Sequence, residues 1–191
     1  MRTRACWLPL TVAGLLCACS PSPAPGDAAA GSPAAAEPVV VAAAAPVAES
    51  AAIAALNASF DPARDPAADL ATAQAEARRS GRRIVLDVGG EWCPWCHLMD
   101  GFIAGDAQIR GFRDAHYVWM KVNYSEDNEN TAFLARYPAV KGYPHLFVLD
   151  ADGTLLHSQF TGELEADPGQ KKGYDRGRFF AFLQQWAAAA G

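Results

Sequence analysis

Two cysteines three residues apart, Cys93 and Cys96, stand where a short apolar segment gives way to a helix. The segment before them, Ile84 to Val88, is apolar except for Asp87, a composition that is typical of a buried strand. Cys93 is followed by Pro94, and a capping residue followed by proline is typical of the first turn of a helix. The pattern therefore predicts a strand, a tight turn and a helix, with both thiols at the junction.

The sequence from residue 65 onward alternates between helical and strand patterns. Helices are expected from Asp65-Pro66 to Arg79, from Cys93 to a bend or end at Gly101, from Asp106 to Arg113, over Glu126–Tyr137 and after Asp175. Strands are expected over Ile84–Val88, Tyr117–Asn123, Leu146–Leu149 and Leu155–Phe160, with a hairpin turn at Asp152-Gly153. This order predicts an α/β fold with a mixed central sheet flanked by helices and ending in an antiparallel hairpin. The connection from Gly162 to Tyr174 is polar and has no assigned element.

The position of the two thiols predicts different roles for them. If Cys93 caps the helix, its sulfur faces the free backbone N–H groups of Trp95 and Cys96. These donors and the helix dipole favour the thiolate, so Cys93 is expected to be the nucleophile. Cys96 lies one turn further along the helix and is expected to be more buried and to act as the resolving thiol.

The N-terminus has the pattern of an export signal. Residues 1–18 combine two arginines with an apolar core that is too short to span a bilayer. The core ends in Leu16-Cys17-Ala18-Cys19, which resembles the bacterial lipoprotein box and predicts lipidation of Cys19. Ser20, where an Asp would favour retention in the inner membrane, favours anchoring in the outer membrane on the periplasmic side. Cleavage after a nearby Ala-x-Ala-like site is the alternative.

An Ala- and Pro-rich segment follows, and residues 19–60 are expected to form a disordered tether. No Lys or Arg occurs between Ser20 and Phe60, and the segment buries too little apolar surface to offset the entropy of ordering. The globular domain is then expected over residues 61–191, with Cys93 and Cys96 as its only free thiols after processing. The formal net charge of −5 argues against a nucleic-acid partner.

The stretch from Ile84 to Cys96, with its Glu-Trp-Cys-x-x-Cys ending, resembles the thioredoxin superfamily, and it is most similar to the exported bacterial branch that carries Trp-Cys-x-x-Cys. The resemblance implies a thioredoxin-like fold and a protein thiol–disulfide oxidoreductase that needs no cofactor. It implies that Asp87 relays the proton of Cys96. By the same resemblance, Gly142-Tyr143-Pro144 is the cis-proline loop that pairs with the substrate backbone.

The resemblance also implies partners and a direction of reaction. The expected substrates are exported proteins with disulfides or thiols, contacted by the side chains of Trp92, Pro94, Trp95, Tyr143 and Pro144. Asp87 favours a reductase or isomerase, since strongly oxidising members tend to lack that acid. Sustained reduction outside the cytoplasm would also require a membrane partner that donates electrons.

Departures from the family pattern leave other readings open. The dipeptide between the cysteines is Pro-Trp, so a reduction potential cannot be transferred, and His145 follows the expected cis-proline where thioredoxin has Thr. Cys93, Cys96 and His97 also match the attachment pattern of c-type haem. A zinc site with His145 added to these three residues, and a redox-inactive binding module, are the remaining alternatives.

Overall fold

The computed structural model describes residues 44–188, so the expected signal segment and Cys19 lie outside the described residues. The elements are α1 (Ala44–Ala55), α2 (Pro66–Ser80), β1 (Arg83–Gly89), α3 (Pro94–Gly105), α4 (Ala107–His116), β2 (Tyr117–Asn123), α5 (Thr131–Leu134), β3 (His145–Leu149), β4 (Leu155–Phe160), the 3-10 turn η1 (Thr161–Leu164) and α6 (Arg176–Trp186). Within this described range, no helix has both the length and the apolar character needed to cross a membrane.

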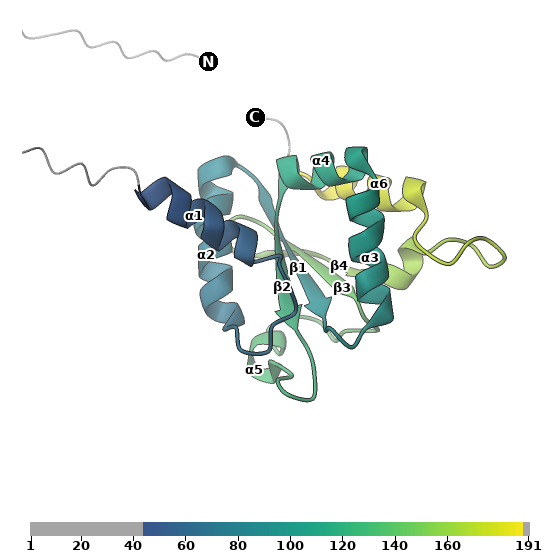
Figure 1. The fold of residues 1–191 in the computed structure, drawn as a ribbon, viewed down its shortest axis with the longest axis horizontal. Coiled ribbons are helices and arrows are strands. Elements are labelled where there is room, and N and C mark those ends of the chain that lie inside the picture. The colour runs from purple at the N-terminus through teal and green to yellow at the C-terminus, as the bar shows by residue number, and fades with distance from the viewer. Residues whose placement is uncertain (1–43, 189–191) are drawn as a thin grey trace, which may run out of the picture. The chain divides into compact units, whose positions relative to one another are not determined.

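The four strands form one sheet in the order β2-β1-β3-β4 (Figure 1). β1 runs parallel to β2 and antiparallel to β3, and β4 pairs antiparallel with β3. The expected mixed sheet with a terminal antiparallel hairpin is thus confirmed. The register places Asp87 of β1 beside Lys121 of β2 on one side and Leu146 of β3 on the other.

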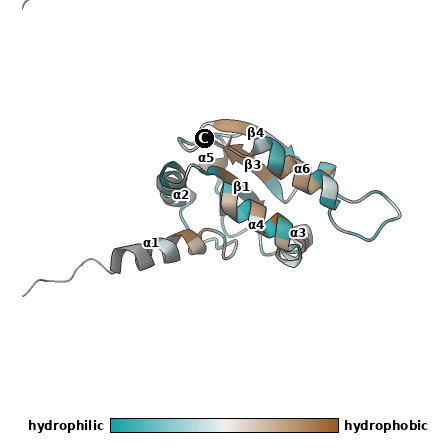
Figure 2. Cartoon of the chain, turned by 90° about the horizontal axis from the view of Figure 1, so that it is seen from above, coloured by the Kyte–Doolittle hydropathy of each residue, from teal (hydrophilic) through white to brown (hydrophobic). Residues whose placement is uncertain are grey.

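Helices cover both faces of the sheet, so the side chains on both faces of the strands are buried. One face packs against α2 and α5, through a core that includes Leu70, Ala73, Ala77, Leu86, Met120, Phe133 and Phe147. The opposite face packs against α3, α4 and α6, through Val85, Met99, Ile103, Ile109, Trp119, Val148, Phe179 and Leu183. The strands are accordingly rich in hydrophobic residues, whereas the helices alternate between hydrophilic and hydrophobic surfaces (Figure 2).

The ends of α2 follow from local chemistry, as the sequence predicted. Asp65 is the N-cap, and its side chain accepts a hydrogen bond from the Ala67 backbone N–H at 2.8 Å. Pro66 occupies the first turn, where its missing N–H costs nothing. Gly81 ends the helix in the left-handed conformation, with φ of 71°.

Two helix predictions were wrong. The helix expected over Glu126–Tyr137 is reduced to α5, because Asn128 and Asn130 fold the preceding residues into a loop. Asn130 has a left-handed φ of 48°, and its side chain donates to the Asn123 carbonyl at 2.8 Å. Gly101, expected to bend or end the second helix, lies within α3, which continues to Gly105.

The structure also differs from the tether expected over residues 19–60. Residues 44–55 of that range form α1, and Leu56 and Phe60 are each only 1% exposed. The carbonyl of Leu56 accepts a hydrogen bond of 2.8 Å from the backbone N–H of Lys121, on the outer side of β2. The packed domain therefore begins before residue 61, because two large apolar side chains among the alanines find places in the core.

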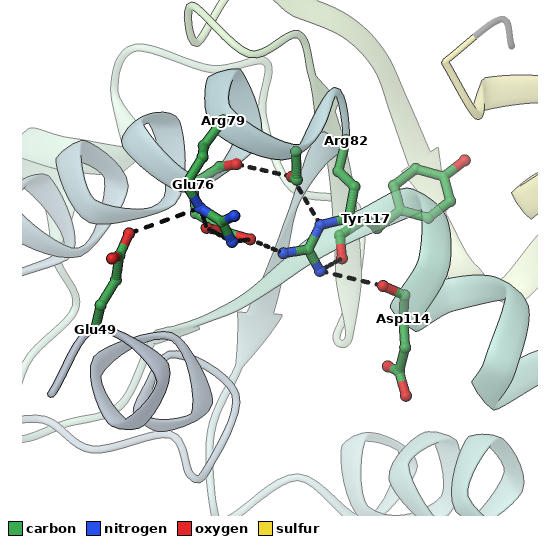
Figure 3. A network of polar contacts seen from close by, with 7 residues as sticks. Glu49, Glu76, Arg79, Arg82, Asp114 and Tyr117 are labelled. Carbon is green, nitrogen blue, oxygen red and sulfur yellow. Dashed lines mark hydrogen bonds and ion pairs between the residues drawn. The ribbon is translucent and has the colours of Figure 1, made fainter. Parts of the chain in front are cut away.

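The buried carboxylate of Glu76 on α2 belongs to a polar network that also reaches α1 and the beginning of β2 (Figure 3). Glu76 is 3% exposed and accepts two hydrogen bonds from Arg79, at 2.8 and 2.9 Å, and one from Arg82. Arg79 also forms an ion pair with Glu49 of α1 at 3.7 Å. Two guanidinium groups thus compensate the buried charge of Glu76, as burial of a carboxylate requires.

The polar connection from Gly162 to Tyr174 contains η1 and a short two-stranded extension. The residues Glu165 and Tyr174 form an antiparallel bridge, and the Ala166 N–H donates to the Gly173 carbonyl at 2.9 Å. This extension, residues 165–174, projects from the domain beside α3 (Figure 1).

Candidate functional site: a dithiol at the amino end of α3

Cys93 is the N-cap of α3, as the sequence predicted. Its backbone is extended, with φ of −92° and ψ of 106°, and its sulfur accepts a hydrogen bond from the Cys96 N–H at 3.2 Å. Pro94 occupies the first turn of the helix. Cys93 and Cys96 are joined as a disulfide, with their Cα atoms 5.3 Å apart. The positive end of the helix dipole thus points at the Cys93 sulfur, where it stabilises negative charge.

Cys96 lies deeper than Cys93. Cys96 has no exposed surface, whereas Cys93 is 3% exposed, and both pack with Phe60 in one small apolar cluster. Gly89, at the end of β1, permits this packing: a Cβ atom on Gly89 would lie 2.5 Å from the Cys96 sulfur and 3.1 Å from the Phe60 ring. Cys96 is therefore enclosed by β1 and by Phe60, which precedes α2.

Asp87 is fully buried in β1, two residues before Gly89 and on the same face of the sheet. Its Oδ2 accepts a hydrogen bond from the Trp119 indole N–H at 3.2 Å, while Oδ1 has no partner. Burial raises the pKa of Asp87 to about 7, although the Trp119 hydrogen bond and the charge of Lys121 oppose the shift. At neutral pH this carboxyl group can therefore both accept and release a proton.

A cation lies next to this carboxyl group. Lys121 is 7% exposed and forms an ion pair of 2.6 Å with Asp100 of α3. Its ammonium group also lies 4.4 Å from the centre of the Phe60 ring, within the range of a cation–π interaction. Lys121 therefore connects β2, α3 and Phe60 around the buried side of the dithiol.

The loop before β3, which contains Tyr143, also contacts this site. The Tyr143–Pro144 bond is cis, as expected, and Pro144 is buried. The Tyr143 ring packs against the cluster of Phe60, Cys93 and Cys96, and its centroid is 5.5 Å from that of Trp92. The structure thus brings the predicted loop and the residue before Cys93 together.

The two tryptophans that flank Cys93 in the sequence have different surroundings. Trp92 is 54% exposed, and its indole N–H donates to the Tyr124 carbonyl at 2.6 Å. Trp95 is half-buried and contacts Tyr174 edge to face, with a centroid distance of 5.7 Å. The ammonium group of Lys172 lies 5.0 Å from the centre of the Trp95 ring. The projecting extension therefore touches the dipeptide between the two cysteines.

The residues of the haem and zinc alternatives do not fit those groups. A covalent haem needs access to both sulfurs, and Cys96 is enclosed. The imidazole Nε2 of His97 lies 2.7 Å from the Glu91 carbonyl oxygen. His145 lies beside Phe147, with ring centroids 4.7 Å apart, on the sheet face opposite to the one that α3 covers. Among residues 44–188, no group of three or more His, Cys, Asp and Glu side chains could hold a metal ion.

Sequence reasoning missed Phe60, Lys121 and Asp100. Lys121 could have been found, because it interrupts an apolar strand just as Asp87 does. Phe60 is the first aromatic residue after a long Ala- and Pro-rich segment, which could have marked the beginning of the core. No local pattern distinguishes Asp100 from other acids on a helix surface.

Comparisons with known proteins agree with this arrangement. A family model described as thioredoxin-like matches residues 65–151, a range that contains Asp87, both cysteines and the cis-proline. The thiol:disulfide interchange protein DsbD of Pseudomonas fluorescens is 29% identical over 111 residues, which is 57% of this chain. The chain spans 16% of the length of that relative.

Solved structures resemble the fold at low sequence identity. A disulphide isomerase from Xylella fastidiosa Temecula1 superposes with a TM-score of 0.55 at 19% identity, over 66% of this chain and 94% of that one. The C-terminal domain of Neisseria meningitidis DsbD in its oxidised form gives a TM-score of 0.46 at 19% identity, over 64% of this chain and 96% of that one. The fold of this domain is thioredoxin-like, as the similarity to the disulphide isomerase structure shows.

Proposed function

We propose that the chain is a thiol–disulfide oxidoreductase that acts on exported proteins as a reductase or isomerase. The observation that carries this proposal is the position of Cys93 at the N-cap of α3, paired with the enclosed Cys96. The names of the relatives, a thiol:disulfide interchange protein and a disulphide isomerase, support the same class of reaction.

The reaction begins with attack of the Cys93 thiolate on a substrate disulfide. The substrate S–S bond breaks, one substrate thiolate leaves, and Cys93 forms a mixed disulfide with the other sulfur. Cys96 then loses its proton to the Asp87 carboxylate and attacks the Cys93 sulfur, which releases the second substrate sulfur as a thiolate that takes a proton from water. Two electrons pass to the substrate, and Cys93 and Cys96 are left as a disulfide.

Asp87 supports the direction of this proposal. A carboxyl group whose pKa is about 7 can take the proton of Cys96 during reduction of a substrate and return it when the dithiol is regenerated. Regeneration needs two electrons, for which we propose a membrane partner with a dithiol of its own. In the isomerase reaction the mixed disulfide is instead attacked by another thiol of the same substrate.

Single substitutions of the cysteines test the assigned roles. With insulin as the substrate, Cys93→Ser is expected to abolish reduction, because the nucleophile is lost. Cys96→Ser is expected to accumulate mixed disulfides that appear as slower bands on non-reducing gels. Mixed disulfides that accumulate in Cys93→Ser instead would reverse the roles, and undiminished reduction by Cys93→Ser would refute the proposal. Equilibration of Cys93–Cys96 with glutathione measures the reduction potential, and a value near those of strong oxidants would refute the direction.

We also propose that Cys19 carries lipid and anchors the protein to the outer membrane, on its periplasmic side. The support is the lipoprotein-box pattern of residues 16–19, together with the Ser that follows it. Several acyl chains give stable anchoring, since each buried methylene contributes about 0.8 kcal/mol. Cys19→Ala is expected to move the protein from the outer-membrane fraction to the soluble periplasmic fraction. Full retention of Cys19→Ala in the membrane would refute the assignment.

A further inference from the structure

An exposed aromatic group lies beside the dithiol. Trp92, at 54%, is the most exposed large hydrophobic residue among those that the structure describes. It is nevertheless fixed, by its hydrogen bond to the Tyr124 carbonyl and by its edge contact with Tyr143. The Tyr124 and Tyr143 rings stack on each other, with centroids 4.8 Å apart. The fold therefore holds an apolar surface open to solvent next to Cys93, and such surfaces mark places where partners bind.

This surface forms one wall of a hollow of about 550 Å³. The other residues that line it come from the loop between β2 and α5, and the full lining is Trp92, Tyr124, Ser125, Glu126, Asp127 and Glu129. We call this feature the aromatic–acidic hollow. Its lining contains three carboxylates and no cationic side chain.

The three carboxylates are exposed and uncompensated. None of them takes part in the ion pairs found among residues 49–188. Glu129 accepts a hydrogen bond of 3.4 Å from the Thr131 hydroxyl group, and no side-chain hydrogen bond is formed by Glu126 or Asp127. Their negative charge is therefore available to a cationic partner.

We propose that the aromatic–acidic hollow docks a substrate segment that carries Lys or Arg close to the reacting cysteine. The proposal rests on the proposed function and names the class of substrate that this dithiol prefers. Charge complementarity supports this occupant, since three carboxylates attract a cation and the Trp92 face offers a cation–π contact. The chain's own segment from Ser20 to Phe60 does not suit the hollow, because it contains no Lys or Arg.

Three matched peptides test the proposal. Each peptide contains one cysteine, blocked as a mixed disulfide with 5-thio-2-nitrobenzoate, and the flanking residues are Lys, Glu or Ala. Turnover oxidises Cys93 and Cys96 to their disulfide and reduces the mixed disulfide to the peptide thiol and coloured thionitrobenzoate. The rate of colour release by the reduced protein is measured for each peptide in stopped flow, at low and at high salt.

The Lys peptide is expected to react about tenfold faster than the Glu peptide at low salt, and the ratio is expected to fall towards one at high salt. Neutralisation of the hollow in the double variant Glu126→Gln/Asp127→Asn is expected to reduce the ratio to less than about threefold. The control Glu49→Gln/Asp114→Asn removes the same two charges at the opposite end of the sheet (Figure 3) and is expected to keep the wild-type ratio.

The outcomes separate this inference from the proposed function. Equal rates for the Lys and Glu peptides in the wild type would overturn the inference. An equal loss of preference in the control variant would also overturn it, because net charge alone would then explain the effect. If none of the three peptides, including the Ala peptide, released thionitrobenzoate, the proposed function itself would fail.

Discussion

Asp87 of β1 is a buried carboxyl group at the candidate site, with 0% exposed surface. A carboxylate in an apolar strand is unfavourable unless it is compensated, and here the Trp119 indole compensates only one of its oxygens. Lys121, which lies opposite Asp87 on the neighbouring strand, forms an ion pair with Asp100. Protonation of Asp87 is therefore the remaining way to relieve the burial, which explains why its pKa rises to about 7.

This shift predicts how stability depends on pH. The pKa of Asp87 is higher in the folded protein than its ordinary value of 3.8, so the folded state binds more protons between pH 4 and 7. The free energy of unfolding therefore falls as pH rises through that range. Asp87→Asn is expected to stabilise the protein by about 1–3 kcal/mol at pH 8 and by much less at pH 5. Urea unfolding of both proteins at the two pH values measures this, and an equal effect at both would contradict it.

Phe60 covers Cys96 in the folded protein. It is 1% exposed and packs on Cys96, so Phe60→Ala is expected to cost about 3–5 kcal/mol and to open a path to the sulfur. In a Cys93→Ser background, Cys96 should then react faster with iodoacetamide under conditions where the protein remains folded. Phe60→Leu keeps an apolar cover and is the matched control. An unchanged rate of alkylation in Phe60→Ala would show that other residues enclose Cys96.

At the scale of elements, α3 carries the cysteines at one end and the partner of Lys121 near its middle. The helix positions Cys93 through capping and Cys96 through packing, because Met99 and Ile103 bury its inner face against the sheet. Asp100 follows Met99 along the same helix and reaches Lys121 on β2. Movement of α3 would therefore disturb the dithiol and the buried charges together.

Two glycines near this helix are expected to respond in opposite ways. Gly101 lies within α3, and a Cβ atom there would meet nothing within 4 Å. Gly101→Ala is thus expected to stabilise the protein by about 0.4–1 kcal/mol, since alanine restricts the unfolded chain. Gly89→Ala is expected to destabilise it, because the added Cβ atom would lie 2.5 Å from the Cys96 sulfur. Thermal unfolding compares the two, and a lower Tm for Gly101→Ala would contradict the regular helix at that position.

The elements that the sequence predicted well are those with local signals. The capped helices and the apolar strands follow from residues such as Asp65, Gly81 and Cys93, whose effects do not depend on distant contacts. The first part of the helix expected over Glu126–Tyr137 is instead a loop. The Asn123 side chain donates to the Asn128 carbonyl and the Asn130 side chain donates to the Asn123 carbonyl, and these bonds depend on the adjoining end of β2. For the same reason, the role of Phe60 could not be derived, since it depends on packing against residues more than thirty positions away.

At the scale of the whole molecule, the segment from α1 to Phe60 belongs to the packed domain. Leu56 joins the core beneath α2, and Phe60 joins the cluster around the dithiol. The Phe60 backbone N–H also donates to the Glu91 side chain at 2.8 Å, two residues before Cys93. The backbone at Phe60 is therefore held directly beside the candidate site.

Truncation tests this assignment of the domain boundary. A chain that begins at residue 44 keeps α1, Leu56 and Phe60, and it is expected to unfold at the same temperature as the full chain. A chain that begins at residue 61 loses two buried apolar side chains, worth about 1.5–3 kcal/mol each, and is expected to have a lower Tm. Thermal unfolding followed by circular dichroism measures both. Equal Tm values for the two truncated chains would place the boundary at residue 61.

The hydrogen bond between Leu56 and Lys121 has a consequence for association between molecules. β2 is an edge strand, both of its faces are buried, and its sequence is predominantly apolar. Such an edge is a template for pairing with a strand of another chain. The Leu56 carbonyl occupies the Lys121 N–H, and the chain around it covers part of this edge. Detachment of the chain around Leu56 would thus expose the unpaired edge of β2 before the core unfolds. Such local opening would allow β2 to pair with another molecule and would lead to aggregation.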